Sequence, residues 1–373
     1  MSTPTLDDLI ETAGVIVCCG SGGVGKTTTA ATLALAAALR GRRAVVVTID
    51  PARRLAEALG ASGGLTNDPR RLDLPLAAEG GELWALMLDA RATFDDLVRT
   101  YAPTPERAAG ILANSFYRNV SSAMSGTQEY MAGEKLYSLV HDDRFDLVIV
   151  DTPPTRRALD FFEAPGRLTR FLDHRVARIM LAPARTSLRV VNLAAQPLLR
   201  TLGRVVGASA LADAMAFLQA FEGMERGFRD RAHAVGELLG AAETRYVLVA
   251  SPRHDTIDEA RFFADELRRR HRRVAAVVVN RIHPLYGPGS AANARHRAGQ
   301  ARDLGDADLA RLWDNLAELR HVAEAERAQL TALHEAVGDA AWAEVPLLDD
   351  DMTDLGGLMA IMTPLFASTS AGR

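Results

Sequence analysis

Short apolar runs alternate with helical patterns along most of this chain. The runs are rich in Val, Ile and Leu and nearly continuous, which is typical of strands that are covered on both faces of a parallel sheet. Several of them end at a polar residue, as at Asp50, Asp151 and Asn280. The pattern predicts an α/β fold with a mostly parallel sheet flanked by helices, and a ligand crevice at the carboxyl ends of the strands. The expected strands are 15–19, 43–49, 83–88, 145–150, 245–250 and 274–279.

Two long stretches, 90–141 and 168–240, do not follow this alternation. Their apolar residues recur at three- and four-residue spacing, which favours helices. We expect a helical subdomain inserted into a single domain that spans 1–373, with breaks in the second stretch at Pro183, Pro197 and Gly203. Residues 283–304 read as a flexible loop. A stripe of one helix or of a helical hairpin follows, at Leu309, Leu312, Leu316, Leu319, Leu330 and Leu333.

Composition adds limits to this picture. The chain has 373 residues, 48% of them hydrophobic, so it can bury a large core. A formal net charge of −4 argues against a sequence-independent nucleic-acid binder. The start of the chain lacks a signal-peptide pattern, and no segment is apolar for the roughly 20 residues that a membrane span needs. We therefore expect a cytoplasmic protein without a membrane span.

The segment between the first strand and the next helical pattern carries the candidate chemistry. It reads Gly20-Ser21-Gly22-Gly23-Val24-Gly25-Lys26-Thr27, with Thr28 directly after it. Glycines allow successive amide N–H groups to point at an anion, and the following helix presents the positive end of its dipole. In such a loop the lysine reaches the β- and γ-phosphates, and the hydroxyl of Thr27 ligates Mg²⁺. The sequence therefore predicts a nucleoside triphosphate site.

Two later strand ends complete a set with this loop. They read Thr48-Ile49-Asp50-Pro51-Ala52 and Asp151-Thr152-Pro153-Pro154-Thr155. With the loop, these segments resemble the ArsA-type ATPases, a family that includes arsenite-pump ATPases and ATPases that target tail-anchored membrane proteins. The resemblance extends to Val279-Asn280-Arg281 and Val345-Pro346-Leu347-Leu348. It implies a P-loop NTPase fold, ATP and Mg²⁺ as cofactors, and a dimer.

The resemblance also implies roles for single residues. Asp50 would orient the attacking water and, with Lys26, be catalytic, and this agrees with the need of phosphoryl transfer for positioning more than covalent chemistry. Asp151 would join the Mg²⁺ shell, through water, beside Thr27. Asn280 and Pro346 would contact the nucleotide. From the residues alone, Asp50 and Asp151 could equally be turn or cap residues, and Asn280 could simply close its strand.

The chain also departs from the family pattern. The signature lysine of the family would fall at position 21, where this chain has Ser21. Arg53, Arg156 and Arg157 are extra cations in the two switch segments, which could replace that charge or lie in solvent. Catalysis is therefore slow, or the missing cation comes from elsewhere, such as a related ATPase in a heterodimer.

Metalloid and zinc sites are not expected. The only cysteines, Cys18 and Cys19, are adjacent in a strand and therefore face opposite sides of the sheet. Clustered thiolates for As(III) and a Cys-x-x-Cys for a shared zinc are both lacking. His271 and His283 do not have the spacing of a metal pair.

The second helical stretch could bind a hydrophobic client helix. It carries flexible and aromatic side chains, which suit an adaptable apolar groove and suit a core equally well. These are Met180, Met215, Met224, Phe171, Phe217, Phe221 and Phe228. We expect an Mg²⁺-dependent ATPase that works as a homodimer or heterodimer and couples ATP and ADP states to a client or partner through the helical subdomain. The alternative is a nucleotide-gated, weakly hydrolysing subunit of a heteromeric complex.

Overall fold

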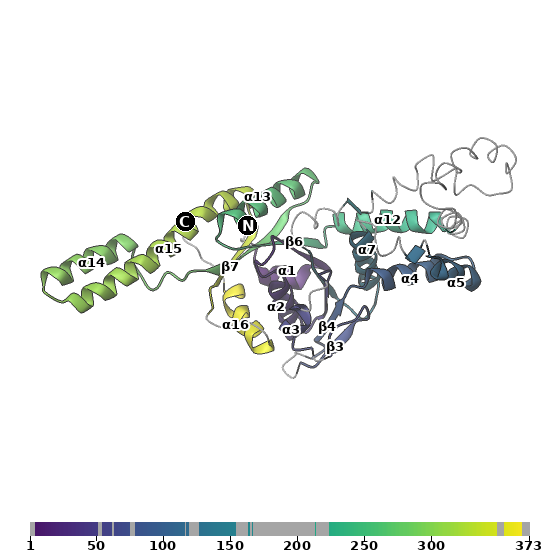
Figure 1. The fold of residues 1–373 in the computed structure, drawn as a ribbon, viewed down its shortest axis with the longest axis horizontal. Helices are drawn as coiled ribbons and strands as arrows, with labels where there is room; N and C mark the ends of the chain where they lie inside the picture. The colour runs from purple at the N-terminus through teal and green to yellow at the C-terminus, as the bar shows by residue number, and fades with distance from the viewer. Residues whose placement is uncertain are drawn as a thin grey trace. The chain divides into compact units, whose positions relative to one another are not determined.

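The structure is a computed structural model of the chain (Figure 1). It describes residues 4–50, 54–61, 63–74, 79–115, 117–118, 127–153, 163–164, 166, 213, 224–348 and 354–367. The chain divides into two compact units. Unit 1 comprises Met1–Met87, Asp142–Thr155 and Ala242–Arg373, and unit 2 comprises Leu88–His141 and Arg156–Ala241.

Unit 1 is built on an eight-stranded sheet with the strand order β3-β4-β2-β5-β1-β6-β7-β8. All neighbouring strands are parallel except β3, which pairs antiparallel with β4 at one edge. The strands are β1 (Val15–Cys19), β2 (Arg43–Thr48), β3 (Arg70–Leu72), β4 (Glu82–Met87), β5 (Leu147–Asp151), β6 (Thr244–Ala250), β7 (Val274–Ile282) and β8 (Ala341–Pro346). This confirms the α/β fold with a mostly parallel sheet.

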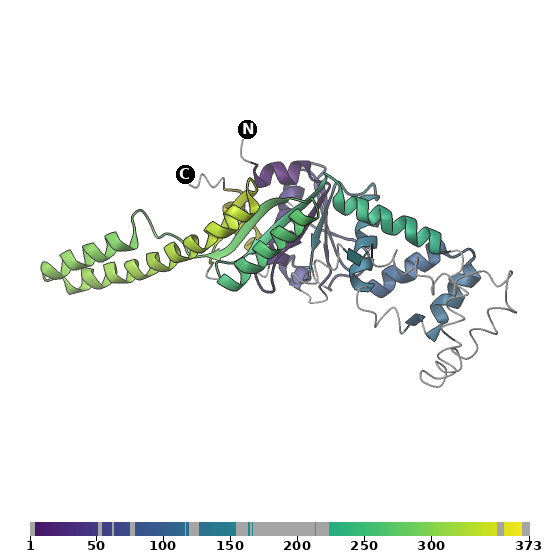
Figure 2. The same cartoon turned by 90° about the horizontal axis from the view of Figure 1, so that it is seen from above.

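Helices cover both faces of this sheet (Figure 2). On one face, α1 (Leu6–Thr12), α2 (Lys26–Leu39) and α16 (Leu355–Phe366) share one apolar cluster with the inward side chains of the strands. The alanine-rich α2 lies on β1, β2, β4 and β5, and small side chains allow this close approach. On the other face, α13 (His254–Arg269) packs on β6, and α15 (Ala307–Val337) packs on α13 and β7. The short helix α3 (Arg54–Ala58) contacts α2.

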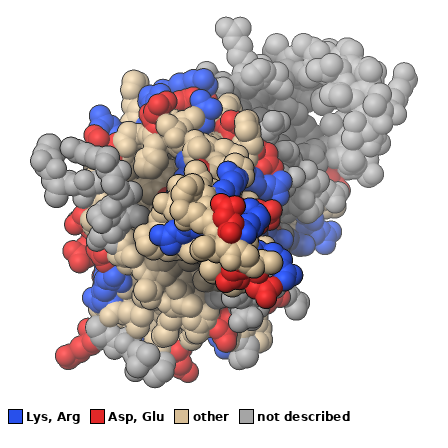
Figure 3. Space-filling view, turned by 90° about the vertical axis from the view of Figure 1, so that its left-hand side faces the viewer, with Lys and Arg blue, Asp and Glu red and all other residues tan. Residues whose placement is uncertain are grey.

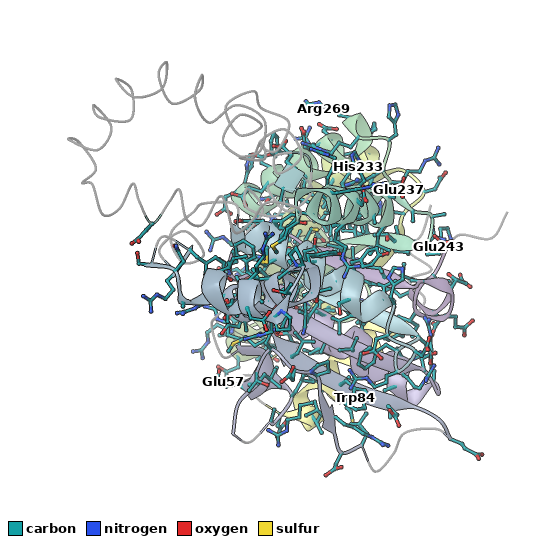
Figure 4. The ribbon with its side chains drawn as sticks, turned by 90° about the vertical axis from the view of Figure 1, so that its right-hand side faces the viewer. Glu57, Trp84, His233, Glu237, Glu243 and Arg269 are labelled. Atoms are coloured by element: carbon teal, nitrogen blue, oxygen red, sulfur yellow. The ribbon has the colours of Figure 1, made fainter. Side chains whose placement is uncertain are left out.

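The sequence pattern did not predict the two edge strands of the sheet, β3 and β8. The three-residue β3 is mostly exposed, and β8 alternates buried and half-buried residues, so neither has the continuous apolar run of a central strand. At β4, the indole of Trp84 (Figure 4) meets the ring of Phe145 edge-on, with centroids 5.6 Å apart. Edge strands of this kind carry a weak sequence signal.

Unit 2 is helical in its described part. It contains α4 (Ala90–Tyr101), α5 (Pro105–Ala113), α7 (Thr127–Val140) and α12 (Glu225–Gly240). Asp89 and Thr104 cap α4 and α5 through their side chains. The carboxylate of Glu134 in α7 accepts hydrogen bonds from the hydroxyl of Tyr130 and, at 2.8 Å, from Nε of Arg231 in α12. Burial raises the pKa of Glu134 although Arg231 opposes the shift.

The apolar core of unit 2 answers part of the question about the second helical stretch. Met224 and Phe228 are buried in one cluster with residues of α4, α5 and α7, so these two side chains pack in a core and do not line an open groove. The exposed side of α12 carries His233 and Glu237 instead (Figure 4). The other Met and Phe residues proposed for a groove, and the breaks expected at Pro183, Pro197 and Gly203, lie outside the described residues.

The expected loop at 283–304 is wrong from residue 291 onward. Ala291–Asp303 forms α14, which Ser290 caps and which packs antiparallel on α15 as a hairpin (Figures 1 and 2). The loop was predicted from the Pro- and Gly-rich segment before Ser290. Alanines at three- and four-residue spacing, Ala291, Ala294, Ala298 and Ala301, are the helical signal that it concealed.

Of the helices described, none is both long enough and apolar enough to cross a lipid bilayer.

Candidate functional site

The predicted phosphate loop joins β1 to α2. Gly25 caps the helix with a left-handed backbone, at φ 96°, which glycine adopts without the strain that a side chain would add. A Cβ at Gly25 would also collide with Nδ2 of Asn280, and one at Gly20 would collide with the carbonyl oxygen of Val249. The loop therefore needs glycine at both ends because neighbouring strands approach its backbone closely.

Three side chains hold carbonyl groups of this loop. Nζ of Lys26 donates to the carbonyl of Ser21 at 2.7 Å. From β7, Nδ2 of Asn280 donates to the carbonyl of Val24 at 2.9 Å, and Nη1 of Arg281 donates to the carbonyl of Gly23 at 3.3 Å. Amide N–H groups are the part of such a loop that receives an anion. These bonds therefore hold three carbonyl groups of the loop in place.

An irregularity in β7 makes the contact of Arg281 possible. The register between β7 and β8 shifts between Asn280 and Ile282, and Arg281 adopts a positive φ of 62°. That conformation is strained for a residue with a side chain. It reorients the chain so that two successive residues, Asn280 and Arg281, both reach the loop. We refer to these two residues as the outer clasp.

Asp151 is the buried carboxylate of the site. It ends β5, and its register partners are Cys18 on β1 and Thr48 on β2. Its Oδ2 accepts hydrogen bonds from Oγ1 of Thr27 at 2.7 Å and from Oγ1 of Thr48 at 2.9 Å. Its Oδ1 is buried and has no hydrogen-bond partner among the described residues. Burial is the main cause that raises the pKa of Asp151 to about 6, and the charge of Asp50 adds to the shift.

Lys26 and Asp50 lie in the same electrostatic environment. The ammonium group of Lys26 is buried, and burial lowers its pKa although Asp151 and Asp50 both act to raise it. Asp50 follows β2 and is half-buried, and its amide N–H lies 3.3 Å from Oγ1 of Thr48. Lys26, Asp50 and Asp151 thus come together as one cation and two carboxylates at the carboxyl ends of neighbouring strands.

Mg²⁺ fits this donor set. Oxygen ligands suit Mg²⁺, and the ion binds proteins through one or two carboxylates while it keeps several waters. The unsatisfied Oδ1 of Asp151 is the acceptor that an ion with its waters would use, and the hydroxyl of Thr27 is bonded to the other oxygen of the same carboxylate. A second buried oxygen of the site, Oγ of Ser21, also has no hydrogen-bond partner among the described residues.

The remaining predicted site residues are placed as follows. Thr28 is half-buried in the first turn of α2. Pro346 on β8 pairs with Ile282 on β7, so it lies at the same end of the sheet as Asn280. The side chain of Asn280 bonds to the loop. The nucleotide contacts of Asn280 and Pro346 stay a prediction.

Sequence reasoning missed three residues of the site. Thr48 and Thr152 hold strand ends together, because Thr48 bonds to Asp151 and Oγ1 of Thr152 donates to the carbonyl of Cys18 at 2.7 Å. Arg281 was the third. The two threonines sit beside candidate carboxylates in the sequence, and that proximity was an available signal. Nothing in the sequence indicates the bulge that brings Arg281 to the loop.

Other expectations concern residues at the margin of the site. Cys18 and Cys19 are free and fully buried in β1, and burial raises the pKa of both thiols. Nδ1 of His283 lies 2.7 Å from the carboxylate of Glu326. Arg53, Arg156 and Arg157, offered as substitutes for the family lysine, lie outside the described residues.

Comparisons with known proteins agree with the loop and the sheet. The family model for ArsA ATPases, described as anion-transporting ATPases, matches residues 13–301. The chain is 28% identical over 172 residues to the ATPase GET3 of Malassezia globosa, which covers 45% of this chain and 48% of that protein. It is 27% identical over 272 residues to the arsenical pump-driving ATPase of Escherichia coli, which covers 71% of this chain and 39% of that protein. The chain therefore matches about half or less of the length of these relatives.

Proposed function

Because the chain belongs to the ArsA family of anion-transporting ATPases, we propose that it binds ATP at the loop Gly20–Thr27 and hydrolyses it in the presence of Mg²⁺. One observation carries this proposal. A glycine loop held by its carbonyl groups lies next to Asp151, a buried carboxylate with one unsatisfied oxygen. The loop would supply amide donors and the ammonium group of Lys26 to the phosphates. Asp151 would supply an acceptor for a hydrated Mg²⁺ ion.

In this proposal each residue has one task. Lys26 exchanges the carbonyl of Ser21 for phosphate oxygens, and its buried position makes the charge effective because little water screens it. Thr27 and Asp151 hold Mg²⁺, Asp151 through water. The ion, when bound, neutralises charge on the phosphate oxygens. Asn280 and Pro346 border the base.

Asp50 is the residue that we assign to water positioning. It follows β2 at the edge where the loop lies, and its charge is near enough to act on the pKa of Lys26 and of Asp151. A carboxylate in this position accepts a hydrogen bond from a water and directs it at the terminal phosphorus. Phosphoryl transfer depends mainly on such positioning and on charge neutralisation.

We further propose that the nucleotide state is coupled to a partner or client. In this view the chain is one P-loop ATPase domain, unit 2 is the helical subdomain that transmits the change, and the working form is a dimer. The family name and the GET3 and arsenical-pump relatives support a coupled ATPase as a class.

Ser21 favours a second candidate function, a nucleotide-gated subunit with little turnover of its own. Its side chain is a neutral hydroxyl that is buried in the loop, where it cannot neutralise charge on the transferred phosphoryl group. A related ATPase would then supply the missing cation. ATP binding without hydrolysis by the isolated chain, with hydrolysis restored by a second subunit, would identify this function.

Phosphate release by purified chain, compared between wild type and Asp50→Asn, tests the proposal. We expect Mg²⁺-dependent release by wild type and a rate about 100-fold lower in Asp50→Asn, with the Kd for ATP changed less than about threefold. Asp303→Asn, an exposed carboxamide substitution at the end of α14, is the matched control and keeps the wild-type rate. Equal rates in wild type and Asp50→Asn would remove Asp50 from the mechanism. Failure of wild type to bind ATP would overturn the function itself.

A further inference from the structure

The candidate base contacts lie where the pairing of β7 with β8 is irregular. The register between these strands shifts between Asn280 and Ile282, and Ile282 then pairs with Pro346. A proline has no N–H group to donate to a neighbouring strand. Beyond the shift, the amide of Leu347 donates to the carbonyl of Ile282 at 2.9 Å. The strand ends that carry Asn280 and Pro346 are therefore at the margin of the regular sheet pairing.

One side chain of α15 joins these two strand ends. Nη1 of Arg327 donates to the carbonyl of His283 at 2.9 Å, and its Nη2 donates to Oε2 of Glu344 at 3.0 Å. His283 follows Asn280 by three residues, and Glu344 precedes Pro346 by two. A planar guanidinium with donors on two sides is suited to such a bridge. We call these two bonds the arginine brace.

Neighbouring side chains of α15 hold the same two segments. Oε2 of Glu326 accepts a hydrogen bond from the N–H of His283 at 2.8 Å, and its Oε1 lies 2.7 Å from Nδ1 of the same histidine. Further along the helix, the ring of His334 stacks on Trp342 of β8, with centroids 3.5 Å apart. The helix is thus attached to both strands, so the arginine brace has a fixed base.

Burial distinguishes the arginine brace from most charged contacts of the chain. The side chains of Arg327 and Glu344 are 27% and 21% exposed. Among the pairs of basic and acidic side chains in the described part of unit 1, the two that α15 makes at the ends of β7 and β8 are the ones that join separate segments with neither side chain more than 29% exposed.

The outer end of α15 differs, because its pair of Arg311 and Asp308 is exposed. Figure 3 faces this end and shows acidic and basic side chains next to one another at the surface. Exposed pairs of this kind contribute little to the structure, whereas removal of one partner of a partly buried pair leaves the other in a poor environment.

We propose that Arg327 is a positioning residue for the base of the bound nucleotide, because it fixes the strand ends that carry Asn280 and Pro346 relative to each other. The inference rests on the proposed function, in which these two residues border the base. Glu344 and Pro346 alternate along β8 and share one face, so the arginine brace holds the face that carries Pro346. The phosphates bind at the loop, to which Arg327 makes no described bond.

Calorimetric titration with Mg²⁺ tests the proposal by comparing ATP with inorganic tripolyphosphate, which has no base. In Arg327→Gln we expect the Kd for ATP to rise about fivefold and the Kd for tripolyphosphate to change less than about twofold, because a base contact is weakened and the loop is intact. Arg327→Lys keeps the charge and can make one of the two bonds, so it should restore part of the ATP affinity. Equal weakening of both ligands in Arg327→Gln would show a merely structural role and overturn the proposal.

Arg311→Gln is the matched control. It removes the exposed pair with Asp308 on the same helix and should bind both ligands as wild type does. Weakening of ATP in this variant to the same extent as in Arg327→Gln would overturn the proposal, because the effect would not depend on the arginine brace.

Glu344→Gln tests the other partner of the brace. It should weaken ATP and spare tripolyphosphate, and the double variant Arg327→Gln/Glu344→Gln should be no weaker than the weaker single variant, because both changes break one contact. Additive effects would overturn the brace. A wild type that binds tripolyphosphate as tightly as ATP would overturn this inference and leave the phosphate loop intact, whereas a wild type that binds neither ligand would overturn the proposed function itself.

Discussion

The phosphate loop and the α14–α15 hairpin use small residues for opposite reasons. In the loop, Gly20 and Gly25 allow β6 and β7 to approach the backbone, and polar side chains then fix the carbonyls. In the hairpin, alanines bring two helices together, and the larger leucines are left on the surface. The first arrangement organises backbone donors for a charged ligand. The second leaves large apolar side chains exposed to water.

The comparison teaches where binding free energy is stored in this chain. At the loop it lies in charges and hydrogen bonds that are already positioned, so removal of one group leaves others buried without partners. At the hairpin it lies in apolar area that water still covers. Changes at the loop should therefore have large effects on nucleotide binding, and changes at the hairpin should have small effects on the monomer.

The largest expected effect comes from Lys26→Ala. Removal of a buried cation that faces phosphate charge costs about 4 kcal/mol, which is a roughly 1,000-fold increase in the Kd for ATP. Isothermal titration calorimetry with Mg²⁺ measures it. Arg295→Ala, on the exposed face of α14, is the control and should bind ATP as wild type does. An unchanged Kd in Lys26→Ala would contradict the loop as the phosphate site.

Asp151→Asn should separate stability from binding. Burial raises the pKa of Asp151 to about 6, above the value near 3.8 of an unperturbed Asp, so the folded state holds the proton more tightly than the unfolded state. Wild type without nucleotide or metal therefore loses stability as pH rises from about 4 to 6, by on the order of 3 kcal/mol. The variant, which cannot ionise there, keeps that stability.

Urea unfolding at about pH 3.5 and pH 8, on either side of that range, measures this difference. The difference in the free energy of unfolding between the variant and wild type should grow in favour of the variant as pH rises. The variant should also lack the added stability that Mg²⁺ and ATP give to wild type. An advantage of the variant that is the same at both pH values would show that the Asp151 carboxyl is not the titrating group.

A third prediction concerns the alanine contact of the hairpin. Ala298→Leu overfills the interface between α14 and α15 and should cost about 2 kcal/mol locally. Hydrogen exchange of the α14 amides reports the loss, and ATP binding should not change. The matched change Ala292→Leu, at an exposed position of α14, should leave exchange as in wild type. Equal protection in both variants would mean that the alanines do not form the contact.

The smallest expected effect is that of the outer clasp. Arg281→Asn retains a residue that tolerates positive φ but removes the bond to the carbonyl of Gly23, and Asn280→Ala removes the bond to that of Val24. Each should weaken binding about fivefold, the effect of one hydrogen bond. Arg281→Asn should weaken ATP and inorganic tripolyphosphate by the same factor, because Arg281 acts on the phosphate loop. Asn280→Ala should weaken ATP more than tripolyphosphate, because in our proposal Asn280 also borders the base. Equal weakening of both ligands in Asn280→Ala would show that Asn280 acts on the loop alone.

Much of the sheet could be predicted because its central strands are buried on both faces. All six predicted strands are present, and the boundaries of the strand at Val15–Cys19 are as expected. The edge strands β3 and β8 were missed because half-exposed strands lack a continuous apolar run. Helix α14 was missed because its stripe is made of alanine, which a search for large apolar residues does not register.

The candidate site divides in the same way. The loop residues and Asp151 were predictable, because strand, glycines, lysine and threonine are adjacent in sequence and Asp151 ends a clear strand. The outer clasp was not, because it depends on a shift in strand register between Asn280 and Ile282. Asp50 was proposed from the resemblance, and the structure adds its electrostatic influence on Lys26 and Asp151.

The single helix α15 connects these two regions mechanically. Its 31 residues span about 47 Å, and its side chains tether the segment that follows Arg281. Glu326 accepts a bond from the amide of His283, Arg327 donates to the carbonyl of His283, and Arg320 donates to the carbonyls of Tyr286 and Pro288. These bonds fix the middle of α15 to the segment that follows the outer clasp. If a partner that binds at the far end of α15 strengthens nucleotide binding, thermodynamic linkage requires that the nucleotide strengthen binding of that partner by the same factor.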